Sequence, residues 1–207
     1  MSVLVGDELE GRLRADGVKR LYVIPMLEPA QLRPSGIDLR LGNQFIVARN
    51  AVMSALDLSA KSPEVRKQIL QYQERMVFPF LSGKPFVLHP GQLVLGSSFE
   101  YIALPLDLEA RIDGRSSLAR LGLTVAGALS IAPGFKGVIT LELANHGNTP
   151  LVLHPGLIIA QLVVSGTQGE APYSARYLYP IGPQFSKLAE DKHLSIWAGE
   201  VHSPSGG

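Results

Sequence analysis

The chain has 207 residues, of which 46% are hydrophobic and 18% charged, and its formal net charge is +1 with no cysteine. This length supports one substantial core, so we expect a single domain over residues 1–207, and the small net charge leaves no broad basic surface for nucleic acid. The missing cysteines exclude disulfides, iron–sulfur ligation and thiolate zinc sites, and with no apolar run long enough to span a bilayer we expect no membrane contact and a cytoplasmic location.

The amino-terminal segment predicts a short helix followed by a strand. Leu9 and Leu13 stand four residues apart within residues 7–14, which is the spacing of one face of a surface helix. Gly17 is placed to end that helix, and the apolar run at residues 21–26 is typical of a short strand. We expect the helix to serve packing rather than chemistry.

Residues 37–41 predict a half-buried strand, because three apolar residues alternate there with Asp38 and Arg40. These two ionisable side chains then share the opposite face of the strand. The favoured interpretation is an exposed ion pair, which contributes little to stability, rather than a catalytic pair.

A second helix is predicted from Ser62, which suits an N-cap, with Pro63 in the first turn. Apolar side chains then recur at helical spacing at Val65, Ile69, Tyr72 and Met76. Because strand-like segments lie on both sides of it, this helix is interpreted as an insertion between strands.

From residue 78 onward, Pro/Gly turns separate short apolar runs, which is the pattern of an all-β sandwich or a distorted, jelly-roll-like barrel. The runs cover residues 86–88, 92–98, 101–104, 138–143, 150–153 and 157–164. Two His-Pro-Gly trios begin at His89 and His154 and raise the alternative of a metal site. A turn explains both better, because Pro and Gly favour a bend and no carboxylate stands at ligand spacing.

Residues 111–145 concentrate the polar chemistry of the chain. Arg115 and two serines open a short segment that predicts a turn and one helical turn ended by Gly122. Four side-chain donors converge there: Arg115, Ser116, Ser117 and Arg120. Downstream, a turn over residues 134–137 leads to a strand over 138–143, on which Glu142 shares one side with Val138 and Thr140. An acid inside an apolar strand is unusual and is a candidate for chemistry or for a buried pair with Arg120.

The carboxyl-terminal arm, from about residue 170, changes in character. Aromatic and basic residues, Tyr173 and Arg176 among them, precede a group of turn-forming prolines and glycine. Such an arm can fold over a ligand or pack on a neighbouring subunit, and the two are compatible.

Three motifs, DGRSSLARLGL at 113–123, APGFKG at 132–137 and ITLELAN at 139–145, resemble the dCTP deaminase branch of the dUTPase and dCTP deaminase superfamily. Further segments follow in the family's order: 34–45, 86–98, 104–117, 153–164 and 175–187. The resemblance implies a mostly β, dUTPase-like distorted jelly-roll barrel with a few short helices. It also implies a homotrimer with sites between subunits.

By the same resemblance, Glu142 matches the catalytic glutamate, Ser116 helps to position the water, and Arg120 belongs to the same hydrogen-bonded cluster. The implied substrate contacts lie at Arg115, Ser117, Ile131, Tyr173 and Arg176. The implied substrate is a deoxynucleoside triphosphate, dCTP first, with dUTP and dTTP as further candidates. The resemblance implies Mg²⁺ carried by the phosphates, with no protein metal ligand and no zinc.

The chain departs from the family at three places. Ala132 stands where relatives carry an aspartate that binds the sugar 3′-hydroxyl, the loop at 125–130 is one residue short, and Pro180 replaces a common glutamine. An unpaired sugar hydroxyl costs about 1–3 kcal/mol of binding free energy. Three functions therefore stay open: a zinc-independent dCTP deaminase that forms dUTP and ammonia, a dUTP pyrophosphatase alone or coupled to deamination, and a catalytically silent nucleotide-binding protein.

Overall fold

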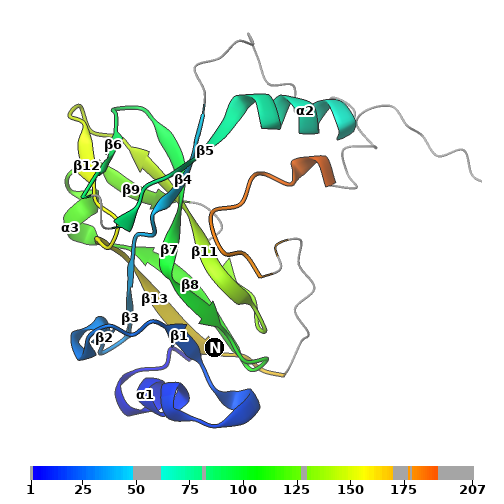
Figure 1. Ribbon diagram of the computed structural model, residues 1–207. Coiled ribbons are helices and arrows are strands. Elements are labelled where there is room, and N and C mark those ends of the chain that lie inside the picture. Colours follow the sequence, from blue (N-terminus) through cyan, green and yellow to red (C-terminus); the bar gives the residue numbers. More distant parts are fainter. Residues whose placement is uncertain are drawn as a thin grey trace, which may run out of the picture.

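In the part of the chain that the structure describes, the strands form two larger antiparallel sheets and one short ribbon (Figure 1). The computed structural model describes residues 2–48, 62–80, 83–126, 130–169, 177 and 179–190. Within these residues the short apolar runs became strands, so the prediction of a mostly β fold is confirmed.

The first sheet has six strands within the described residues and follows the order β5-β4-β7-β11-β9, with β1 paired to β7. Its strands are β1 (Tyr22–Ile24), β4 (Gln44–Ala48), β5 (Gln73–Val77), β7 (Leu93–Ala103), β9 (Leu123–Ala126) and β11 (Lys136–Asn145). The two runs predicted at 92–98 and 101–104 are one continuous strand, β7, because no turn residue interrupts them.

The second sheet has five strands within the described residues, in the order β10-β8-β13-β3-β2. Its strands are β2 (Leu32–Arg33), β3 (Gly36–Arg40), β8 (Leu108–Gly114), β10 (Ser130–Ile131) and β13 (Ile158–Gly166). The separate ribbon pairs β6 (Phe86–Leu88) with β12 (Leu151–Leu153).

One hydrophobic core joins the sheets and the ribbon. Ile37, Leu162 and Ile112 lie opposite one another on β3, β13 and β8, and all three are buried. Leu141 and Leu143 of β11 belong to the same buried cluster. Since strand side chains alternate between faces, the residues between these apolar ones lie on the opposite face of each sheet.

Three α-helices occur in the described residues: α1 (Gly6–Arg14), α2 (Ser62–Tyr72) and α3 (Ser116–Ala119). Short 3₁₀ turns cover η1 (Gly17–Lys19), η2 (Pro29–Gln31) and η4 (Leu188–Glu190). Leu9 of α1 and Val65 and Ile69 of α2 are buried, as predicted. The predicted stripe of α2 extends too far, because Met76 lies in β5, where Gln73–Val77 pairs with β4.

Both His-Pro-Gly trios are turns, as predicted. Gln92 N–H donates to the carbonyl of His89, and Leu157 N–H donates to that of His154, each at 3.1 Å. The glycines have φ of +74° and +91°, which is the left-handed conformation that a type II turn needs after proline.

The prediction for Asp38 and Arg40 is wrong. Asp38 is 4% exposed and Arg40 is 7% exposed, and all of β3 is buried. The two side chains do not pair with each other. Arg40 donates to Glu100 of β7 at 2.7 Å, while Asp38 accepts from Arg33 at 2.7 Å. Alternation along a strand cannot reveal that a second layer covers the polar face as well.

Candidate active site at the fork between β9 and β11

Glu142 lies where two strands separate. Leu123 of β9 lies opposite Asn145 of β11, and the pairing continues as far as Ala126 opposite Glu142. The next strand in the chain, β10, pairs with β8 instead. Among the described residues, β11 therefore loses its β9 partner just before Glu142. The edge of β11 that precedes the fork is partly covered by the arm, where Val138 N–H donates to the carbonyl of Pro180 at 2.8 Å.

The side chain of Glu142 is half-buried on the outer face of the first sheet. The pairing of β11 with β7 shifts register between Val138 and Thr140, so the predicted alternation is regular only from Thr140 onward. Leu141 and Leu143 point into the core, while Thr140 and Glu142 are partly exposed. Removal from water raises the pKa of the Glu142 carboxyl above its ordinary value, because burial disfavours the charged form.

Arg120 does not neutralise Glu142. In the described part of the chain, neither side chain has an ion pair or a side-chain hydrogen bond, and Arg120 is exposed at the end of α3. The alternative interpretation of Glu142 as a structural acid paired with Arg120 is thus wrong within one chain. Desolvation alone acts on the carboxyl.

The predicted donors gather on α3, as the sequence indicated. Arg115 caps the helix, Ser116 and Ser117 form its first turn, and Arg120 ends it. Gly122, with φ of +92°, stops the helix and turns the chain into β9. The hydroxyls of Ser116 and Ser117 are exposed and have no hydrogen-bond partner in the part of the chain that the structure describes. These donors are free to meet a ligand.

Arg115 is held from behind by a buried acid. Its Nη1 lies 3.5 Å from Oδ2 of Asp38, which also accepts a 2.7 Å hydrogen bond from Nε of Arg33. A buried carboxylate that faces two arginines restrains their direction while leaving part of each guanidinium exposed. The exposed side of Arg115 can therefore bind an anion.

Sequence reasoning missed Gln161, which lies between two acids on the second sheet. On β13 it is directly opposite Asp38 of β3 and Asp113 of β8, and it is partly exposed. The signal was a single amide inside the apolar run at 157–164. Its position next to Asp38, the acid that contacts Arg115, became visible only through the strand register.

Ile131 is buried at 6% exposure in β10, opposite Ala110 of β8. Its side chain belongs to the core, so only its backbone can contact a substrate. The next residue, Ala132, is exposed at the start of a turn in which Phe135 N–H donates to its carbonyl at 3.2 Å. Pro133 and Gly134, with φ of +78°, complete a type II turn.

Tyr173 and Arg176 lie outside the described residues, as do residues 127–129 of the loop after β9. The described part of the arm, residues 177 and 179–190, runs beside β11 at first and ends, at η4, next to α2 (Figure 1). The carbonyl of Pro180 accepts from Val138 N–H at 2.8 Å, and Gln184 N–H donates to the hydroxyl of Thr140 at 3.2 Å. The arm therefore lies along the open edge of β11, two residues from Glu142.

Within one chain, the structure thus provides two partial sites. Glu142 stands at the fork of the first sheet, and α3 with Arg115 and Asp38 lies at the end of β8 in the second. The described residues include no group of three or more His, Cys, Asp or Glu side chains that could hold a metal. The groups available are a half-buried carboxyl at one place and guanidinium and hydroxyl donors, which suit an anion, at the other.

A family model described as dCTP deaminase-like matches residues 3–167. The chain belongs to the dCTP deaminase-like family. A "dCTP deaminase, dUMP-forming" from Dictyoglomus thermophilum is 40% identical over 180 residues, which cover 83% of this chain and 89% of the relative. A "dCTP deaminase" from Haloarcula marismortui is 38% identical over 182 residues, covering 84% of this chain and 90% of the relative.

The fold of this dCTP deaminase-like chain also has a solved counterpart. The crystal structure of a 2′-deoxycytidine 5′-triphosphate deaminase from Agrobacterium tumefaciens matches with a TM-score of 0.56 and 21% identity, covering 78% of this chain and 47% of that chain. At this identity the likeness concerns the fold alone.

In the described part of the chain, no helix combines the length and the apolar character needed to cross a bilayer.

Proposed function

We propose that this chain catalyses the hydrolytic deamination of dCTP to dUTP and ammonia. The observation that carries the proposal is Glu142, a half-buried carboxyl with a raised pKa at the fork of β9 and β11. A carboxyl whose pKa is moved toward neutral pH both takes and returns protons efficiently. The names of relatives that are 38–40% identical over most of the chain support dCTP as the substrate.

In the proposed reaction, the oxygen of a water molecule adds to C4 of the cytosine ring while the Glu142 carboxylate accepts a proton from it. Glu142 then delivers that proton to the amino nitrogen, the C4–N bond breaks, and ammonia leaves. The hydroxyl left on C4 gives up its proton as the C4 carbonyl forms, and N3 of the ring gains one, so the product is the uracil base. One water is consumed and one ammonia is released. Ser116 orients the water, and Arg120 completes the hydrogen-bonded cluster around it.

Arg115 and Ser117 bind the triphosphate in this proposal. A guanidinium and a hydroxyl match phosphate oxygens, and Asp38 keeps Arg115 directed outward at 3.5 Å. These donors suit an anion and not a cation, so Mg²⁺ would arrive on the phosphates as part of the substrate. Tyr173 and Arg176 of the arm add further phosphate contacts, the backbone at Ile131 contacts the nucleoside, and Gln161 stands close to the same anion.

The two partial sites of one chain would be joined by assembly. We propose a homotrimer in which α3 of one copy faces the β9–β11 fork of the next, because Arg120 and Ser116 make no contact with Glu142 within one chain's described residues. Light scattering at micromolar concentration tests this directly. A monomeric mass that retains full turnover would contradict it.

A second candidate is the formation of dUMP, in which the same site also removes pyrophosphate. The name "dCTP deaminase, dUMP-forming" of the 40% identical relative favours it. Ala132 argues against it, because the missing aspartate is the residue that helps to activate water for that step in dUTPases.

A silent nucleotide-binding protein is the third candidate, and the absence of turnover on all substrates would favour it.

One experiment separates the three. Purified protein is incubated with Mg²⁺ and dCTP, dUTP or dTTP in separate reactions, and ammonia, nucleotides and pyrophosphate are quantified after chromatography. Ammonia and dUTP in equal amounts would support deamination alone, whereas dUMP and pyrophosphate would support the second candidate. Binding without any product would leave only the silent protein.

A further inference from the structure

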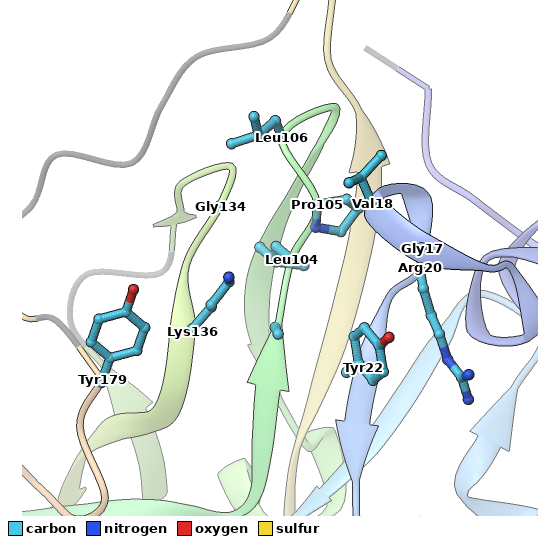
Figure 2. A pocket seen from close by; sticks show the side chains of 11 residues that line it. Gly17, Val18, Arg20, Tyr22, Leu104, Pro105, Leu106, Gly134, Lys136 and Tyr179 are labelled. Carbon is cyan, nitrogen blue, oxygen red and sulfur yellow. The ribbon is translucent and has the colours of Figure 1, made fainter.

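A separate cavity of about 390 Å³ opens at the far end of the first sheet (Figure 2). Its walls come from η1, β1, the end of β7, the turn that follows β7, the start of β11 and the arm. Of the turn that carries Ala132, only Gly134 reaches it, and none of Glu142, Arg115, Ser116, Ser117 or Arg120 lines it. Its size lies within the range of small-molecule sites in proteins.

The register of three strands explains why the cavity exists. Tyr22 of β1, Ala103 of β7 and Lys136 of β11 lie directly opposite one another in a row across the sheet. Directly opposed side chains stand about 4.5–5.5 Å apart at Cβ, so a methyl group between two long side chains leaves a hollow. Leu104 and Pro105 add an apolar wall.

The polar side chains of the cavity all carry hydrogen-bond donors: the guanidinium of Arg20, the ammonium of Lys136 and the hydroxyls of Tyr22 and Tyr179. Figure 2 shows Lys136 and Tyr179 on one side and Tyr22 with Arg20 on the other. Among the residues that line the cavity there is no carboxylate. Within the part of the chain that the structure describes, neither Arg20 nor Lys136 has an ion pair, and neither tyrosine hydroxyl has a hydrogen-bond partner.

The aromatic rings add a second kind of recognition. The guanidinium of Arg20 lies 4.9 Å from the centre of the Tyr22 ring, which fixes both side chains at the rim. Tyr179 has φ of +49°, a left-handed conformation that is strained for a residue with a bulky side chain. Strain of this kind is retained when the surroundings require it, and it clusters at ligand sites.

We propose that this cavity is a binding site for a small planar aromatic molecule that carries a phosphate, of the size and chemistry of a nucleoside monophosphate. The flat ring packs on Ala103 and Leu104 between the two tyrosines. The phosphate accepts hydrogen bonds from Lys136, Arg20 and the tyrosine hydroxyls. The two cations and the tyrosine hydroxyls, with no carboxylate among the lining side chains, select the anion. The apolar floor selects the ring, so neither part of the ligand alone should bind well.

The test is isothermal titration calorimetry with adenosine 5′-monophosphate as the probe, since a purine is a poor fit for a pyrimidine deaminase site. Inorganic phosphate and adenosine are titrated separately. We expect the monophosphate to bind at one site per chain and each part to bind at least about tenfold more weakly. Equal affinity for phosphate alone would overturn the proposal in favour of a simple anion patch.

Matched variants locate the site. Ala103→Leu fills the floor of the cavity without changing any charge. The double variant Arg20→Gln and Lys136→Gln removes both cations. Each of these two variants should bind the probe about tenfold more weakly or worse. Arg115→Gln is the control for the proposed catalytic site and should leave probe binding unchanged. Thermal melting checks that each variant is folded.

The outcomes are distinct from those for the proposed reaction. Probe binding that survives Ala103→Leu and both charge changes but disappears in Arg115→Gln would assign the probe to the catalytic site and refute a separate one. No detectable binding at millimolar probe would refute it as well. Either result would leave dCTP deamination untouched, because that reaction is measured independently by ammonia release.

Discussion

Nε of Arg40 donates to Oε1 of Glu100 at 2.7 Å, and the other carboxylate oxygen accepts the backbone N–H of Arg40 at 2.9 Å. Glu100 is fully enclosed, and Gln31 bonds to both partners. This buried pair ties β3, which carries Asp38, to β7 of the first sheet. It joins the two sheets through charge as well as through the core.

Glu100→Gln should therefore be strongly destabilising. It leaves the Arg40 guanidinium buried without its counter-charge, which costs about 3–5 kcal/mol of unfolding free energy. Urea unfolding at a fixed protein concentration measures the change. The exposed acid Glu28 offers a control, and Glu28→Gln should change the free energy by less than about 0.5 kcal/mol. Equal effects of the two substitutions would contradict the structural role of the pair.

Glu142→Gln should abolish most of the proposed turnover. Glutamine keeps the size and hydrogen-bonding reach of the side chain but cannot accept a proton, so deamination should fall about 10²-fold or more while nucleotide binding survives. Ammonia release and equilibrium binding of dCTP measure the two effects. Unchanged turnover would remove Glu142 from the mechanism.

The same substitution should stabilise the fold at neutral pH. Burial raises the pKa of the Glu142 carboxyl in the folded state. The contribution of this group to the free energy of unfolding is therefore complete below its ordinary pKa of 4.5 and is lost as the pH rises through the folded-state pKa. Glu142→Gln should therefore melt higher than the parent at pH 7–8, and the difference should vanish below about pH 4. A loss of several kcal/mol at neutral pH would instead indicate that a cation pairs with Glu142, such as Arg120 of a neighbouring copy in the proposed trimer.

For Asp107 we predict the opposite pH dependence of stability. Hydrogen bonds from Arg12, at 2.8 and 3.1 Å, lower the pKa of Asp107 and attach α1 to the turn before β8. The contribution to stability is present above the ordinary value of 3.8 and is lost as pH falls through the folded pKa. Asp107→Asn should lower the free energy of unfolding by about 1 kcal/mol at pH 7. The loss should shrink as the pH falls below the ordinary Asp107 pKa of 3.8. Asp16→Asn, at an exposed acid, is the control and should change the free energy of unfolding by less than about 0.5 kcal/mol at pH 7.

Arg75 should anchor the arm. It donates to the carbonyl of Pro183 at 2.9 Å, and its guanidinium lies 5.4 Å from the centre of the Phe185 ring. Arg75→Gln removes both the charge and the stacking, so limited proteolysis within the arm should accelerate several-fold while the melting temperature changes little. The exposed Arg14 supplies the control, and Arg14→Gln should leave the cleavage rate unchanged. Equal cleavage of parent and Arg75→Gln would refute the anchor.

Ala132→Asp should improve substrate binding. Ala132 is exposed at the first position of its turn, where aspartate is well tolerated, so the fold should be unaffected. The new carboxylate would accept a hydrogen bond from the sugar hydroxyl and lower the KM for dCTP by about tenfold. Steady-state kinetics with dCTP measures the change. A raised KM, or a large loss of stability, would show that this turn does not face the sugar.

The sequence by itself determined the local elements, because their signals are local. Period-2 runs between Pro-Gly turns predicted most of the longer strands, Gly122 predicted the end of α3, and the motif at 113–123 predicted the cluster of donors there. Glu142 stood out for the same reason, as an acid where strand alternation leaves little room for one.

Only the tertiary structure decided which groups meet. Arg40 pairs with Glu100, sixty positions away, and Asp38 supports Arg115, which is 77 positions away, because strand register brings them together. Neither the expected pair of Asp38 with Arg40 nor the alternative pair of Glu142 with Arg120 is made among the described residues of one chain, because spacing along the sequence does not show which residues of other strands cover a face. The cavity beside Ala103 has the same origin: a small residue becomes a hollow only when its neighbours on the adjacent strands are large.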